Sequence, residues 1–196
     1  MALSTTHSRP LMLTTIVVWV LLCLLSVTAA LPTAPNINTR TCTNYLINPS
    51  FESGAIEPWL PIVESAWSTR GVFANPFTHQ GTHYYYAHAT STVESTLTLS
   101  QSGLNAPVGA TVDCYAWVAG KRGEGVTRIE VILDGVSCGA SQFNVGEDGW
   151  KKVGGKVKVI GGVPETGSTL AIVVTSKSAG DEGWEVWVDD VGVVSC

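Results

Sequence analysis

Aromatic side chains occur at every second position in two stretches of the sequence. Tyr84 and Tyr86 have this spacing in one stretch, and Tyr115 and Trp117 have it in the other. Alternate residues of a β-strand share one face, so Tyr85 and Ala116 between these aromatic residues would face a core and the four named rings would face away from it. Exposed aromatic rings are suited to stacking on the C–H faces of sugar rings.

A third stretch places charged side chains at the same spacing. Arg128 and Glu130 alternate with Ile129, Val131 and Leu133, and their polar groups could hydrogen-bond to sugar hydroxyls. If the three strands are neighbours, one face would carry a carbohydrate-binding set of six residues: Tyr84, Tyr86, Tyr115, Trp117, Arg128 and Glu130. The alternative is that the aromatic residues support loops or pack under an N-terminal segment.

The string at 135–139, GVSCG, matches the nucleophile elbow of serine hydrolases. That motif needs a helix after the serine, with an aspartate and then a histidine later in the chain. Residues 140–150 are rich in glycine and unlike a helix, and every histidine precedes Ser137. We therefore expect Ser137 not to be a catalytic nucleophile, and we single out no catalytic residue in this chain.

The first thirty residues have the pattern of a signal peptide. A basic n-region precedes an apolar run from Leu11 to Leu25, and small residues follow at 27–30. The run is shorter than the roughly 20 residues that a membrane span needs. We expect a signal peptide at 1–30, a flexible lead-in at 31–41 and one domain at 42–196, in a protein secreted to the extracellular space or the cell wall.

Four cysteines follow the expected cleavage site: Cys42, Cys114, Cys138 and Cys196. An even number in a secreted chain predicts two disulfides, and four cysteines allow three connectivities. We favour Cys42 with Cys196, which would tie the two ends of the domain together, and Cys114 with Cys138, which would join neighbouring strands. The chain has no Cys-x-x-Cys pair, so zinc is not expected.

The charge of the mature chain is negative. Without Arg9, 10 basic residues stand against 16 acidic residues, a net charge of −6. This balance argues against nucleic acid and anionic membranes as partners, and we expect a monomer that does not associate with membranes after cleavage.

Short runs rich in valine, threonine and aromatic residues, separated by turn residues, predict an all-β sandwich or barrel. We expect strands near 45–47, 66–70, 83–89, 95–101, 111–119, 128–133, 150–160, 170–176 and 184–194. Asp134-Gly135 is a typical turn pair after one of them.

Several stretches together resemble the CenC-type carbohydrate-binding modules of families 4 and 9, in their fungal secreted branch. The stretches are LINPSFESG at 46–54 with Pro58-Trp59, HQGTH at 79–83, TLSQ at 98–101, Gly149-Trp150 and VDDV at 188–191. The resemblance implies a galactose-binding-like jelly roll that binds a cell-wall polysaccharide without catalysis. Two alternatives stay open: a cell-surface structural or interaction protein with the same fold, and an accessory module linked to glycoside hydrolysis.

The resemblance also implies a structural calcium ion. It would be held by Glu52 in the opening loop and Asp189 in the closing strand, with backbone carbonyls or Thr82 as further ligands. Calcium prefers six to eight oxygen ligands, and a cation would relieve the repulsion between two carboxylates. Pro49-Ser50 stands where relatives often carry Gly-Asp, so no aspartate contributes there.

Overall fold

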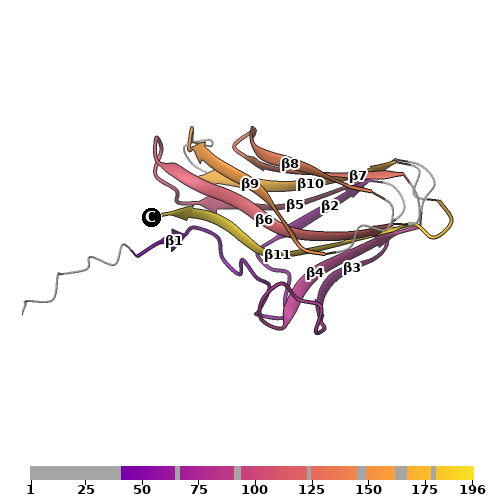
Figure 1. The fold of residues 1–196 in the computed structure, drawn as a ribbon. Helices are drawn as coiled ribbons and strands as arrows, with labels where there is room; N and C mark the ends of the chain where they lie inside the picture. Colours follow the sequence, from indigo (N-terminus) through magenta and orange to yellow (C-terminus); the bar gives the residue numbers. More distant parts are fainter. Residues whose placement is uncertain are drawn as a thin grey trace, which may run out of the picture. The chain divides into compact units, whose positions relative to one another are not determined.

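A computed structural model describes residues 41–196 apart from 65–66, 91–93, 123–124, 145–148, 162–166 and 178–179 (Figure 1). The expected signal peptide and all of the expected lead-in except residue 41 lie outside the described residues. Within the described part, no helix has the length and apolar character that a membrane span requires.

The described residues form eleven strands in two antiparallel sheets, and the two sheets are the layers of a sandwich (Figure 1). Sheet A has the order β3 (Trp67–Ala74), β4 (His83–Ala89), β11 (Trp184–Ser195), β6 (Thr111–Arg122) and β9 (Lys151–Lys158), with β1 (Thr43–Asn44) also paired to β11. Sheet B has the order β2 (Leu60–Glu64), β5 (Ser95–Leu104), β10 (Ser168–Lys177), β7 (Val126–Leu133) and β8 (Val136–Asn144). The expected all-β sandwich is confirmed.

Alternation along the strands builds the core between the sheets. In β10, Leu170, Ile172 and Val174 are buried, and the residues between them are only partly covered. Strands β5, β6, β7 and β11 alternate in the same way over most of their length. One face of each sheet therefore packs inward and leaves the other face as an outer surface of the sandwich.

The predicted strands correspond to observed strands with three differences. The residues 45–47 follow β1 instead of forming a strand, and the strands β2 and β8 were not predicted. β2 is five residues long and contains Pro61, and β8 contains Gly139 among small polar residues, so both are poor in strand signals. The predicted turn at Asp134-Gly135 is confirmed, with φ of 51° and 79°.

Two disulfides join the pairs that the sequence favoured, Cys42–Cys196 and Cys114–Cys138. The second was expected to join neighbouring strands, and it joins β6 of sheet A to β8 of sheet B, so it links the two sheets. A side chain at Gly139 would come within 3.0 Å of the Gly154 backbone on β9. The two glycines thus let the sheets approach closely beside this disulfide.

Candidate functional site

The four predicted aromatic residues share the outer face of sheet A. β11 lies between β4 and β6, pairing Trp187 with Tyr86 on one side and Asp189 with Trp117 on the other. The inward neighbours Ala87 and Ala116 are fully buried, which leaves the alternate positions pointing outward. The strand pattern therefore predicted the direction of these aromatic side chains correctly.

Arg128 and Glu130 do not join them, which corrects the expectation of a single face. Both lie on β7 in sheet B, and their outward side chains are on the opposite outer face of the sandwich. The two form an ion pair with a separation of 2.9 Å. A hydrogen bond from Ser137 holds the pKa of Glu130 below its usual value, and the Arg128 charge adds to this. The sequence pattern gives the direction of a side chain within a strand but not the sheet to which the strand belongs.

Much of the aromatic face is covered by the β3–β4 loop, residues 75–82. His79 stacks on Trp117, with ring centroids 3.9 Å apart and an angle of 18° between the planes. Phe77 packs edge-on against Trp187 at 5.3 Å and stacks with Trp150 at 5.8 Å. The two tryptophans of the face are thus in contact with rings of the protein itself.

The tyrosines of this face are also partly engaged. Tyr84 is only 5% exposed and accepts a hydrogen bond from Trp187. The ammonium group of Lys152 lies 3.9 Å from the ring centre of Tyr115. Tyr86 contacts the ring of Trp187 at 5.6 Å and the ring of Phe73 edge-on at 5.5 Å, and Phe73 is 39% exposed.

Two carboxylates hold the covering loop and the first residue of β4. Oε1 of Glu52 accepts hydrogen bonds from the backbone N–H groups of Thr82 and His83, at 2.9 and 2.8 Å, and Oε2 accepts one from the Thr82 hydroxyl. Oδ2 of Asp189 accepts bonds from the N–H groups of His79 and Gln80, at 3.0 and 3.2 Å. The fully buried Asp189 has its pKa raised to about 6 by burial, against the effect of these N–H donors.

This donor set does not fit a calcium ion held between Glu52 and Asp189. Calcium needs several oxygen atoms directed at one point, whereas the backbone groups aimed at these carboxylates are N–H groups. No group of three or more acidic, histidine or cysteine side chains that could hold a metal occurs among the residues that the structure describes. Calcium binding by Glu52, Asp189 and Thr82 stays a prediction from the resemblance.

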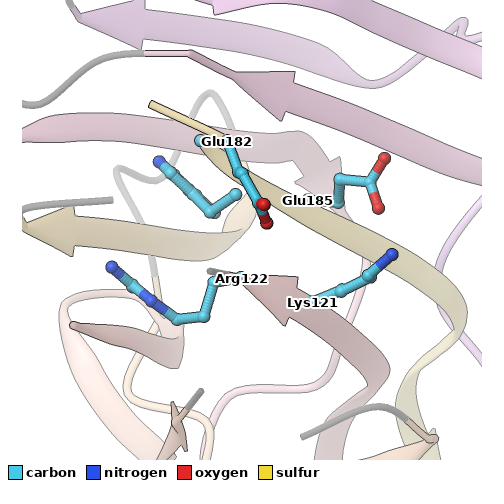
Figure 2. Close-up of a pocket in the computed structure, with 6 residues that line it drawn as sticks. Lys121, Arg122, Glu182 and Glu185 are labelled. Carbon is cyan, nitrogen blue, oxygen red and sulfur yellow. The ribbon is translucent and has the colours of Figure 1, made fainter. Parts of the chain in front are cut away.

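A polar pocket of about 120 Å³ lies beside the uncovered part of this face, where β6 ends and β11 begins. Six residues line it: Lys121, Arg122, Glu182, Gly183, Trp184 and Glu185. Glu182 extends over the pocket toward Lys121 and Arg122 (Figure 2). Glu185 pairs across the sheet with His88 on one side and Lys121 on the other, and it accepts a hydrogen bond of 2.7 Å from the Tyr86 hydroxyl.

Arg122 forms the inner wall of the pocket and is 4% exposed. Its guanidinium donates to the hydroxyls of Thr127 and Ser176, at 2.5 and 2.9 Å, and to the carbonyl of Lys177 at 2.9 Å. An arginine stays protonated even when buried, so it supplies a fixed positive charge behind the pocket. Because its donors bind both β7 and β10, it also fixes this end of sheet B to sheet A.

Gly183 sets the position of Glu182 at the rim of the pocket. It has a φ of 69°, and a Cβ there would come within 2.0 Å of the Ala89 carbonyl oxygen. Only glycine fits this approach. The turn from Gly180, closed by the N–H of Gly183, therefore presents Glu182 beside the start of β11.

Sequence reasoning missed this pocket. Glu182 stands in a glycine-rich turn, where solvation explains an acidic residue without any ligand. The available signal was the parity of β11, because Glu185 alternates with Trp187 toward the outer face.

The pocket can bind hydroxyl groups, and the six described residues that line it include no serine, threonine or cysteine nucleophile. Two carboxylates offer hydrogen-bond acceptors, Lys121 offers three donors, and Tyr86 lies beside them. Ser137 of the hydrolase-like string is elsewhere, on β8 after a hairpin turn, and it donates to Glu130. The strand–turn–strand context differs from the helix that a nucleophile elbow requires.

No protein-family model matches the chain, and no curated protein matches it either. Among solved structures, TmCBM61 in complex with β-1,4-galactotriose is similar, with 24% identity and a TM-score of 0.51 over 78% of this chain and 98% of that one. A structure of promiscuous carbohydrate-binding modules of the β-sandwich superfamily has 17% identity and a TM-score of 0.52, over 73% of this chain and 59% of that one.

Enzymes share the fold as well. A Stig cyclase from Fischerella sp. TAU, solved with an indole ligand, has 16% identity and a TM-score of 0.51, over 79% of this chain and 98% of that one. The chain therefore has a β-sandwich fold found in carbohydrate-binding modules, and the fold alone does not assign a function, because both binding modules and enzymes use it.

Proposed function

We propose that this chain is a secreted, non-catalytic module that binds a cell-wall polysaccharide, with its sugar site in the pocket of Lys121, Glu182 and Glu185. The observation that carries the proposal is this pocket of paired donors and acceptors next to exposed aromatic edges, on a fold that solved carbohydrate-binding modules share. The two disulfides support an extracellular location. The resemblance to the fungal CenC-type branch supports the same class of partner.

Binding would use the polar and apolar groups of the site together. The carboxylates of Glu182 and Glu185 accept hydrogen bonds from sugar hydroxyls, and the Lys121 ammonium donates to hydroxyl or ring oxygens. Charge-assisted hydrogen bonds of this kind are stronger than neutral ones. The hydrogen bond from Tyr86 holds the Glu185 carboxylate in place, and the Phe73 and Tyr86 edges offer an apolar surface to the C–H groups of a sugar ring.

The covered aromatic face favours one alternative. With His79 on Trp117 and Phe77 on Trp187, the expected stacking platform is largely occupied. A cell-surface interaction protein that keeps the fold but binds no sugar would have the same arrangement. The two functions differ in whether the pocket residues matter for retention on a polysaccharide.

The test is retention of the protein on insoluble cellulose, chitin, β-1,3-glucan and β-1,4-galactan, followed by titration with oligosaccharides of the polymer that retains it. We expect Glu182→Gln and Glu185→Gln each to weaken binding by about tenfold or more, since each removes a charge-assisted bond. Glu64→Gln, at an exposed position on β2 of sheet B, is the control and should bind as the wild type does.

Retention on none of the polymers would favour the interaction protein. Equal retention of the wild type and both pocket variants would show that the sugar site lies outside this pocket. Release of reducing sugar during the incubation would contradict the non-catalytic role.

A further inference from the structure

Strand β9 concentrates positive charge in an otherwise acidic protein. Its sequence, KKVGGKVK, holds four of the ten basic residues that follow residue 30. The mature chain as a whole has a net charge of −6. A positive stretch in such a chain needs a local explanation.

Three of the four lysines point to the same side. The register pairs Lys152 with Trp117, Lys156 with Asp113 and Lys158 with Thr111 across β6. These β6 residues alternate with the buried Val112, Cys114 and Ala116, so the three lysines belong to the outer face of sheet A. All three are exposed, while Val153 between them is buried. We call Lys152, Lys156 and Lys158 the lysine row.

One end of the row is held in place by an ion pair, and the other end has no ion pair within the described part of the chain. Lys152 bonds to the Asp113 carboxylate at 2.8 Å and lies over the Tyr115 ring. Of the residues that the structure describes, none forms an ion pair with Lys156 or Lys158. Strand geometry puts the Cα atoms of these two lysines about 7 Å apart and the Cα of Lys152 about 13 Å from that of Lys156, so the three residues follow one line along the strand.

Protection of a sheet edge is the simplest reason for lysine on an edge strand, since charge discourages pairing with another chain. The other edge strands of this protein carry little or no positive charge. β2 (LPIVE) and β8 (VSCGASQFN) contain no lysine or arginine, and β3 (WSTRGVFA) contains one arginine. Edge protection therefore does not account for three lysines on one face of β9 alone.

We propose that the lysine row is a binding surface for a linear anionic polysaccharide, with carboxylates or sulfates of successive sugars meeting successive ammonium groups. Because the lysine row is one strand wide, its shape matches a single extended polysaccharide chain. Its area is too small for binding to a membrane surface. The row lies on the outer face that also carries the pocket, but the inference does not depend on sugar binding there. The net negative charge of the protein disfavours nonspecific binding of polyanions. Retention of the protein on a polyanion would therefore indicate binding by the lysine row.

The test compares polygalacturonate with its fully methyl-esterified form, which has the same backbone without charge. We expect the wild type to bind the acid form at about 20 mM salt, to lose it by about 500 mM salt because the exposed charges are then screened, and to ignore the ester. Lys156→Gln and Lys158→Gln should each weaken binding about threefold, as expected for exposed ion pairs, and should show a smaller salt dependence.

Lys177→Gln is the matched control, because it removes one exposed lysine charge from sheet B. It should bind as the wild type does. Heparin, tested in parallel, separates the two chemical sources, and tighter binding to it at equal charge would assign sulfates in place of carboxylates. The proposal is overturned if the acid form is not retained at low salt, or if Lys158→Gln and Lys177→Gln weaken binding equally. Retention of polysaccharide by the pocket variants but not by the lysine variants would separate this surface from the proposed pocket.

Discussion

The imidazole ring of His79 lies flat on the indole ring of Trp117, with centroids 3.9 Å apart, and its Nδ1 is 2.6 Å from a carboxylate oxygen of Asp190. The backbone N–H of the same histidine bonds to Asp189. Trp117 and Asp189 are partners across β6 and β11. The loop is thus fixed by its backbone and its side chain to the same two strands, and the covered aromatic residues form a small second core outside the sandwich.

Trp117→Ala is therefore expected to destabilise the fold. Removing the ring strips His79 of its stacking partner and opens a cavity under the loop, so we expect the free energy of unfolding to fall by about 2–4 kcal/mol. Trp117→Phe keeps an aromatic ring and should cost less than half as much. Urea unfolding of the three proteins measures this. An unchanged midpoint for Trp117→Ala, with loss of polysaccharide binding, would make Trp117 a sugar platform after all.

Removal of divalent cations tests the role of Glu52 and Asp189. Because both carboxylates accept N–H donors from the 79–83 segment, we expect the same melting temperature in excess EDTA and in 1 mM calcium. Glu52→Gln should lower the melting temperature under both conditions, since one oxygen is replaced by an amide group that cannot accept. A melting temperature that rises with calcium in the wild type, and not in Glu52→Gln, would instead support the calcium site implied by the resemblance.

Ionisation of the Tyr85 phenol should lower the stability of the protein at alkaline pH. Tyr85 is fully buried, and burial raises its pKa from 10.0 to about 12, against the opposing effect of Arg70. Its hydroxyl has no hydrogen-bond partner among the described residues. Tyr85 ionises at a lower pH in the unfolded chain than in the folded protein. The free energy of unfolding therefore keeps its full value below pH 10 and falls by about 3 kcal/mol as the pH rises through 12.

Tyr85→Phe should remove that part of the alkaline loss and, at pH 7, should leave stability unchanged or raise it by about 1 kcal/mol, since no hydrogen bond is broken. Tyr84→Phe is the contrasting variant, because it takes an acceptor from Trp187 and should cost about 1 kcal/mol. Unfolding curves between pH 7 and 11.5 measure both effects. A clear loss of stability in Tyr85→Phe at pH 7 would mean that the hydroxyl has a bound partner.

Alternation was enough to predict most strands and the direction of their side chains. The pattern around Tyr115 and Trp117 correctly placed both rings on an outer face, and the favoured pairing among the three possible ones is the pairing observed. The pattern could not place Arg128 and Glu130, because assigning a strand to a sheet depends on contacts between strands distant in sequence. The same limit explains why the sequence did not show that the Cys114–Cys138 disulfide links the two sheets.

The path of the 75–82 loop could not be predicted from the sequence, for a related reason. A loop has no periodicity, and its position here depends on Asp189, which lies 110 residues from His79, and on Glu52, which lies 30 residues from Thr82. The resemblance implied that these two carboxylates are calcium ligands. That calcium site stays a prediction, and in the structure the two carboxylates accept N–H donors from the 79–83 segment. The pocket at Glu182 and Glu185 likewise depends on where β6 ends beside β11.

The two disulfides should differ in their resistance to reduction. Cys42 and Cys196 are both exposed, whereas Cys114 is fully buried and Cys138 is half-buried between β6 and β8. Because thiol exchange needs access to sulfur, a mild reductant under native conditions should open Cys42–Cys196 first. Alkylation of the new thiols followed by peptide mass mapping identifies the order.

The chain-entropy model assigns a stabilisation of about 5 kcal/mol to the disulfide that closes the longer loop and about 3.5 kcal/mol to the other. The Cys42→Ser/Cys196→Ser variant should therefore be destabilised more than the Cys114→Ala/Cys138→Ala variant. The reverse order of stability would show that linkage of the two sheets matters more to the fold than closure of its ends.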